Sequence, residues 1–378
     1  MGFVKPYLKQ ADYICFIVSV AILPLSIKLS SKLLFIAILL GLIRSIYTKD
    51  FRWFSNQKPI IIFSVVFVLY IIVQGLVLDG TEVLLKTFDR AYAPYLIFIF
   101  VPLFYNNDRI VKQIPIVLIA GICTLFFLII VNSLIELQWY NREKVLEVFD
   151  MHHLYISLYI LFVINFLFSE VSKFNIKSTA VLLSIMVLFL FFFKSKAAII
   201  AALFLSLYHT ILRLKLTWLK IIIIGLIFGG LIFIFNTFLL ELYLRALDFR
   251  TRIWEVALDY ILQNPLLGYG SNHEHDLLNK GHFLNGNYDF LDSNLNAHNQ
   301  FLTFLLKFGI IGFLLILFSF ISPLFKMNFN LKKEYFGFLI LFFCMGFIES
   351  LYNRHHGIVF CTIALYYYNS IKDFKSIK

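Results

Sequence analysis

Residues 296–312 read NAHNQFLTFLLKFGIIG, a short polar start followed by an apolar run. The apolar character continues to residue 325, which makes the segment long enough to cross about 30 Å of hydrocarbon as a helix. His298 stands between two asparagines at the mouth of this run. We therefore predict a membrane-spanning helix that begins beside a titratable ring.

Similar apolar runs recur along the whole chain. Hydrophobic residues make up 61% of the sequence, charged residues only 15%, and the mean hydropathy is +0.86. This balance predicts an all-α polytopic membrane protein with about twelve transmembrane helices. The predicted spans are 11–27, 32–47, 59–77, 88–105, 114–135, 152–168, 176–193, 197–214, 218–239, 298–325, 335–350 and 358–371.

The distribution of Lys and Arg predicts the orientation. An even number of spans puts both termini on one side, and that side carries most of the basic residues, among them Lys5, Arg44 and Lys173. The positive-inside rule makes it cytoplasmic. The net charge of +11 is therefore a topology signal, and no nucleic-acid partner is expected. We expect the first span to remain uncleaved, and the four cysteines, all within apolar runs, to form no disulfide.

Residues 240–297 form the one large connection, predicted to lie on the outer side. The chain then divides into spans one to nine (1–239), the outer loop (240–297) and spans ten to twelve (298–378). Connections this long usually carry function.

The first part of the loop predicts an amphipathic interfacial helix over about 250–263. Asp248 or Thr251 is its candidate N-cap, and Asn264-Pro265 ends it. Arg250 would then lie in the first turn, where a helix N-terminus and a guanidinium together bind anions. Snorkelling of Arg250 to lipid phosphates is the alternative interpretation, and both remain open.

The second part of the loop is polar and rich in turn residues, so we expect it to be irregular and solvated. Its histidines and carboxylates could in principle hold a divalent metal, although an H-x-H pair alone is a weak signal and no metal site is predicted. These residues are His273, Glu274, His275, Asp276 and His282.

His298 opens the tenth span, with Asn296 as the expected N-cap and Asn299 beside it. The helix dipole disfavours a protonated ring there, and a neutral ring can act as a general base. The alternative is an interfacial histidine that tolerates both phases.

Further candidates lie on the same outer face. Lys194 and Lys196 occupy the tight hairpin before span eight, and Arg354 the last outer turn. Second-rank positions, expected mainly to form ion pairs or to snorkel, are Lys86, Asp89, Arg90, His355 and His356.

The sequence FRTRIWEVALDYILQNPLLGYG followed by NAHNQFLTFLLKFGIIG resembles the O-antigen ligase and polymerase family of bacterial surface-polysaccharide enzymes. The family pattern is an Arg four residues before Trp or Tyr, then N/x-P-x-x-G-x-G, then H-N-x-x-L before a glycine-bearing span. The matching residues are Arg250, Trp254, Pro265, Gly268, Gly270, His298, Asn299 and Leu302. The family often has Ser-Arg before span eight, where this chain has Ser195-Lys196, so the bidentate grip on a phosphate is lost there.

The resemblance implies a metal-independent, inverting glycosyltransferase of the C-type membrane fold (GT-C), without a cofactor. Such enzymes take a glycan from undecaprenyl diphosphate at the outer face of the bacterial inner membrane and pass it to an acceptor hydroxyl. Arg250, Lys196 and Arg252 would bind the leaving diphosphate, and His298 would orient or deprotonate the acceptor. The partners implied are the lipid-linked glycan, lipid A-core or a growing polysaccharide, and membrane lipids.

The motif does not choose between acceptors. A ligase acting on lipid A-core is favoured because the chain has one large outer loop. A repeat-unit polymerase and a protein O-oligosaccharyltransferase remain alternatives. A twelve-span transporter or flippase is less favoured, because the ionisable residues cluster at the outer boundary and not at span centres.

Overall fold

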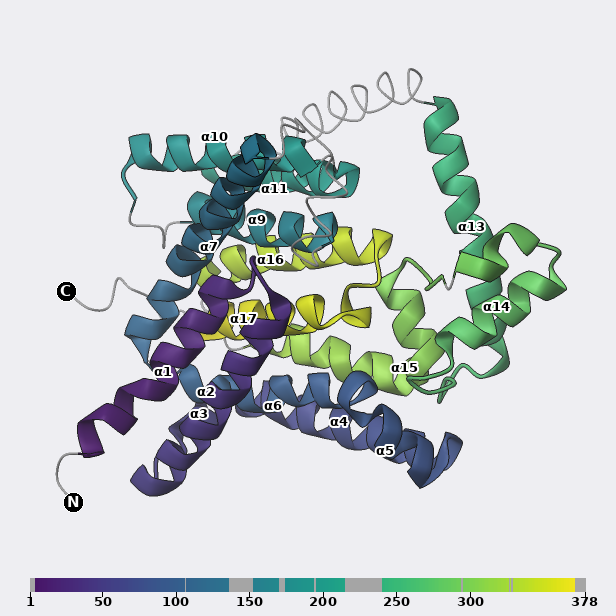
Figure 1. Ribbon diagram of the computed structural model, residues 1–378, viewed down its shortest axis with the longest axis horizontal. Helices are drawn as coiled ribbons and strands as arrows, with labels where there is room; N and C mark the ends of the chain where they lie inside the picture. The colour runs from purple at the N-terminus through teal and green to yellow at the C-terminus, as the bar shows by residue number, and fades with distance from the viewer. Residues whose placement is uncertain are drawn as a thin grey trace.

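The computed structural model describes residues 4–105, 107–135, 152–169, 174–193, 195–214, 240–293, 295–325, 327 and 329–370. Every regular element in these ranges is a helix, and most of the long helices run roughly along the long axis of the molecule (Figure 1). The helices α13 and α14 lie at one end of that axis, and α1 begins at the other (Figure 1). Two predicted features, span 218–239 and Lys194, lie outside the described residues.

The α-helices are α1 (Val4–Ile22), α2 (Ile27–Thr48), α3 (Arg52–Asn56), α4 (Lys58–Leu78), α5 (Gly80–Ala91), α6 (Ile97–Phe100), α7 (Asp108–Ile135), α9 (His153–Phe168), α10 (Ile176–Phe193), α11 (Lys196–Leu214), α13 (Leu240–Gln263), α14 (Glu274–Leu284), α15 (Gln300–Ile321), α16 (Phe329–Ile348) and α17 (His355–Ser370). The 3₁₀ helices are η1 (Ala93–Leu96), η2 (Val101–Phe104), η3 (Tyr288–Ser293), η4 (Ser322–Phe325) and η5 (Leu351–Asn353).

The centre of the bundle is formed by α9 and α17. Every residue of α9 from Leu154 to Leu167 is buried, and α17 is buried from His356 to Tyr368. Both helices are apolar all round, as expected for helices enclosed by others. Around them, α4 packs on α15, α1 on α2 and α7, and α11 on α16.

The outer helices expose apolar side chains. On α4, Leu69, Val73 and Val77 are exposed along one face, and on α7 the same holds for Phe127 and Ile130. Five described helices are long and apolar enough to cross a membrane, namely α2, α4, α7, α10 and α15 with η4. The chain is thus a polytopic helical membrane protein, while the number of twelve spans stays a prediction.

The predicted span 88–105 is not one helix. The helix α5 ends at Ala91, and residues 93–104 form the short elements η1, α6 and η2. Pro94 and Pro102 explain the interruption, because each removes a backbone donor and clashes with the preceding turn of an α-helix.

The segment 240–297 is more regular than predicted. The helix predicted over about 250–263 begins at Leu240, so neither Asp248 nor Thr251 caps it. It ends at Gln263, as the Asn264-Pro265 pair predicted. Residues 274–284, expected to be irregular, form α14.

Candidate active site

The turn that precedes α15 carries His298 in an unusual backbone conformation. Its φ of 45° lies in the left-handed region, which residues other than glycine rarely adopt. The side-chain oxygen of Asn296 accepts a hydrogen bond from the His298 N–H at 2.8 Å, which stabilises this turn. The N-cap of α15 is Asn299 and not Asn296, because the Asn299 oxygen accepts from the N–H groups of Phe301 and Leu302.

A carboxylate faces the His298 ring. Nδ1 of His298 lies 3.3 Å from Oε2 of Glu349, which follows the last residue of α16. Burial alone would raise the pKa of Glu349, but the hydrogen bond and charge of His298, with the charge of His152, lower it below its ordinary 4.5. Glu349 is therefore ionised at neutral pH and holds Nδ1 of the ring as a donor, which leaves Nε2 as the acceptor.

Sequence reasoning missed Glu349. Glu349 falls inside the predicted span 335–350. Only its position at the end of the apolar run distinguishes it from the other residues of that span. The helix α16 ends at Ile348, which puts the carboxylate just beyond the helix.

The helix α13 supports the histidine turn through two aromatic side chains. The indole N–H of Trp254 donates to the carbonyl of Ala297 at 3.0 Å, and its ring packs edge-on against Phe347 at 5.4 Å. The Phe249 ring lies 6.1 Å from the His298 ring. The Trp of the family pattern thus fixes the backbone next to the histidine.

Arg250 directly follows Phe249 in α13. Because α13 begins ten residues earlier, Arg250 is inside the helix, and the predicted anion site at a helix N-terminus is wrong. The side chain is half-buried, and no described residue accepts a hydrogen bond from its buried Nε. Arg250 therefore retains donor capacity, one residue along the helix from the Phe249 ring that faces His298.

Arg252 is engaged within the protein. Its Nη2 lies 3.3 Å from Asp248 and 3.4 Å from Asp289, and its guanidinium stacks over the ring of Phe290 at 4.5 Å. Two carboxylates balance its charge, so it is less available to a ligand than Arg250.

The two other candidate cations are Lys196 and Arg354. Lys196 is the first residue of α11 and is exposed, and Arg354 is exposed between η5 and α17. No described contact joins either side chain to His298.

The glycines of the N-P-x-x-G-x-G segment dock the loop onto α15. The helix is broken at Gly309, whose φ is 60° and ψ is −172°. The free carbonyls of Leu306 and Lys307 accept from the N–H groups of Tyr269 and Gly270, at 2.9 and 2.8 Å.

The same docking satisfies the free donors after the break. The N–H groups of Ile310 and Ile311 donate to the carbonyls of Pro265 and Leu266. Gly268 has φ +68°, and a Cβ there would lie 2.5 Å from the backbone nitrogen of Gly309. The motif is therefore a structural joint that replaces the hydrogen bonds lost at a helix break within an apolar segment.

The histidines of the H-x-H pair do not converge. Nε2 of His273 pairs with Asp79 at 2.5 Å, and Nδ1 of His275 lies 3.0 Å from the carbonyl of Leu295. Glu274 and His282 are buried, so the prediction of a solvated loop is wrong for them.

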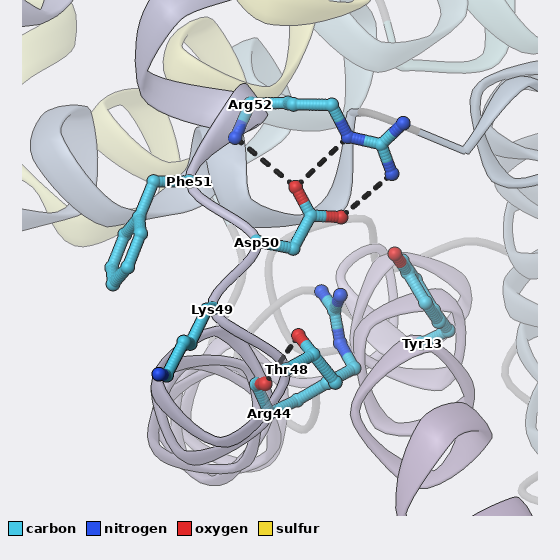
Figure 2. Close-up of a pocket in the computed structure, with 7 residues that line it drawn as sticks. All are labelled: Tyr13, Arg44, Thr48, Lys49, Asp50, Phe51 and Arg52. Carbon is cyan, nitrogen blue, oxygen red and sulfur yellow. Dashed lines mark hydrogen bonds and ion pairs between the residues drawn. The ribbon is translucent and has the colours of Figure 1, made fainter.

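A hollow of about 540 Å³ lies where α2 meets α3, away from α13 and α14 (Figures 1 and 2). Arg52 donates two hydrogen bonds from its guanidinium and one from its backbone N–H to Asp50, which lowers the pKa of that carboxyl to about 2. Arg44 donates to the buried Asp12 at 2.8 Å. Both guanidinium groups that line the hollow are thus paired with carboxylates, and we assign no ligand to it.

Comparison with known proteins gives one family. Residues 181–317 match the sequence model of the O-antigen ligase family. The matched segment includes Lys196, Arg250, the N-P-x-x-G-x-G segment and His298. It does not include Glu349 or Arg354. No curated protein matches the chain. Residues 181–317, which carry Arg250, Trp254, the N-P-x-x-G-x-G segment and His298, are thus similar to the O-antigen ligase family.

Proposed function

We propose that the protein is a membrane glycosyltransferase that moves a glycan from undecaprenyl diphosphate to a hydroxyl of lipid A-core. The observation that carries the proposal is the His298–Glu349 pair, in which His298 lies in a left-handed turn whose backbone is held by Trp254. The match of residues 181–317 to the O-antigen ligase family supports the same reaction class.

His298 acts as the general base in this proposal. Glu349 accepts the hydrogen bond from Nδ1–H, so Nε2 is free to take the proton from the acceptor hydroxyl. The acceptor oxygen attacks the anomeric carbon from the side opposite the diphosphate. One C–O bond forms, the C–O bond to the diphosphate breaks, and the configuration is inverted.

Arg250 stabilises the leaving diphosphate. The negative charge that develops on the phosphate oxygens needs a cation, and the unpartnered Nε of Arg250 supplies a donor at this place. Lys196, at the position where the family often has Arg, and Arg252 are further cations for the same group. The reaction uses no metal ion and no cofactor.

The orientation in the membrane follows from the same proposal. Donor and acceptor meet at the outer face of the bacterial inner membrane, so the loop 240–297 is periplasmic and both termini are cytoplasmic. Figure 1 supports this arrangement, since α13 and α14 lie at the end opposite the start of α1. Spans one to nine then occupy 1–239 and spans ten to twelve 298–378.

The test is a gel of surface and lipid-linked polysaccharide from cells that lack the gene. The cells are restored with wild type, Arg250→Ala or the control Arg90→Ala, at equal membrane levels. A ligase predicts loss of long surface chains, with full-length polymer kept on its lipid carrier, in the Arg250→Ala cells only.

Two other outcomes would contradict the acceptor proposed here. A single repeat still joined to lipid A-core would identify a repeat-unit polymerase. Unchanged polysaccharide with unglycosylated proteins would identify a protein O-oligosaccharyltransferase.

A further inference from the structure

Glu274, the first residue of α14, is a buried carboxylate that accepts four hydrogen bonds. Only 2% of its surface is exposed. Oε2 accepts from Lys307 Nζ and from Asn353 Nδ2, each at 2.9 Å. Oε1 accepts from the N–H of Ala297 at 3.2 Å and from the hydroxyl of Thr303 at 2.9 Å.

These partners come from the segments that carry the two members of the His298–Glu349 pair. Ala297 directly precedes His298. On the other side, the Thr303 hydroxyl bonds the hydroxyl of Ser350 at 2.8 Å, and Ser350 directly follows Glu349.

Asn353 closes the network. Its Oδ1 accepts from Lys307 Nζ at 2.7 Å while its Nδ2 donates to Glu274, so η5 is tied to both α14 and α15. One side chain thus connects the backbone beside the histidine with the backbone beside its carboxylate.

The charge of Glu274 requires Lys307. Burial by itself would raise the pKa of Glu274, but the charge and hydrogen bond of Lys307, with the donors of Ala297 and Thr303, lower it below its ordinary value. A buried carboxylate and a buried ammonium each need the other, because either one alone would be left uncompensated.

We propose that Glu274 is a positioning residue for the transfer reaction. Through its hydrogen bonds it sets the distance between His298 and Glu349. This inference rests on the proposed function, since it assigns Glu274 to the same base. No described contact joins Glu274 to the His298 ring or to the Glu349 carboxylate. Glu274 acts through Ala297, Thr303 and Asn353.

The test compares two neutral replacements of the Glu274–Lys307 pair. In Glu274→Gln with Lys307→Met, the Gln oxygen still accepts from Ala297 and Thr303. The Asn353 amide, released from Lys307, can turn over so that its Oδ1 accepts from the Gln NH₂. In Glu274→Ala with Lys307→Met, the buried charges are gone but so are these bonds. Both double variants avoid an uncompensated charge, so both are expected to fold.

The measured quantities are kcat and KM for the lipid-linked donor in nanodiscs, and the melting temperature. We expect the Gln/Met enzyme to keep kcat within about threefold of wild type, and the Ala/Met enzyme to lose about tenfold or more at unchanged KM. Equal kcat in both, once corrected for the folded fraction, would overturn the inference.

Three further variants distinguish the possible outcomes. The single variant Glu274→Gln leaves Lys307 without its carboxylate partner. Adding Lys307→Met should restore kcat, and this comparison holds even if the Ala/Met protein does not fold. Failure of this rescue contradicts the proposal. Glu255→Gln, an exposed glutamate on α13, is the matched control. His298→Ala is run beside them, because wild-type transfer by that variant would refute the proposed function itself.

Discussion

Nδ1 of His298 lies 3.3 Å from Oε2 of Glu349, although the two residues are 51 positions apart in the chain. The histidine belongs to a left-handed turn before α15, and the glutamate to the turn after α16. A histidine and a carboxylate in this relation form a base whose ring orientation is fixed by its partner.

Replacing Glu349 by Gln should lower kcat by about 10- to 1,000-fold with little effect on donor KM. The amide no longer favours a proton on Nδ1, so the ring loses its fixed tautomer. Steady-state transfer by the purified enzyme measures this effect, with Glu82→Gln, an exposed glutamate on α5, as control. An unchanged kcat would show that Glu349 does not serve the base.

Gly309→Ala should destabilise the protein by at least roughly 2 kcal/mol more than Gly80→Ala. Both glycines have positive φ, but a Cβ at Gly80 meets open space, whereas one at Gly309 collides with the carbonyl of Leu266. The difference in free energy of unfolding between the two variants measures how tightly residues 265–270 pack against the break in α15. Equal losses would mean that the joint is not tightly packed.

Asp12→Asn should cost about 3 kcal/mol, because it leaves Arg44 without its buried counter-ion. The pair joins α1 to α2, and a second Arg44 donor bonds the carbonyl of Leu103 in η2. Asp50→Asn breaks the more exposed pair seen in Figure 2 and should cost less than about 1 kcal/mol. A comparable loss in both variants would contradict the burial argument.

The pKa of Glu274 predicts loss of stability in acid. Since its pKa in the folded protein lies below the ordinary 4.5, the unfolded chain binds the proton first as the pH falls. The stabilisation is complete above about pH 4.5 and is lost as the pH drops through the lower folded pKa. The melting temperature of wild type should fall more steeply below pH 4.5 than that of Glu274→Gln with Lys307→Met; parallel curves would exclude Glu274 as the cause.

Apolar run length predicted the long helices well, because a run of about 20 apolar residues has few other stable conformations in a membrane. The spans 59–77, 176–193 and 298–325 correspond closely to α4, α10 and α15 with η4. The prediction failed at 88–105, where the apolar average concealed Pro94 and Pro102.

The site was predictable only where its residues belong to the ordered sequence motif. The order Arg250, Trp254, His298 could be recognised along the chain. In the structure, Trp254 donates a hydrogen bond to the carbonyl of Ala297, the residue before His298. Glu349 and the Glu274–Lys307 pair lie outside that motif or at its variable positions, and only the folded structure brings their side chains together with their partners.

The most direct test of the account is transfer by purified His298→Ala in nanodiscs that contain the undecaprenyl-diphosphate glycan and lipid A-core. His275→Ala, an exposed histidine on α14, serves as the control. The account predicts that the His298 variant, folded and at equal amount, loses about 100-fold or more of the transfer rate while the control keeps it. Transfer by His298→Ala at the wild-type rate would contradict the assignment of the base.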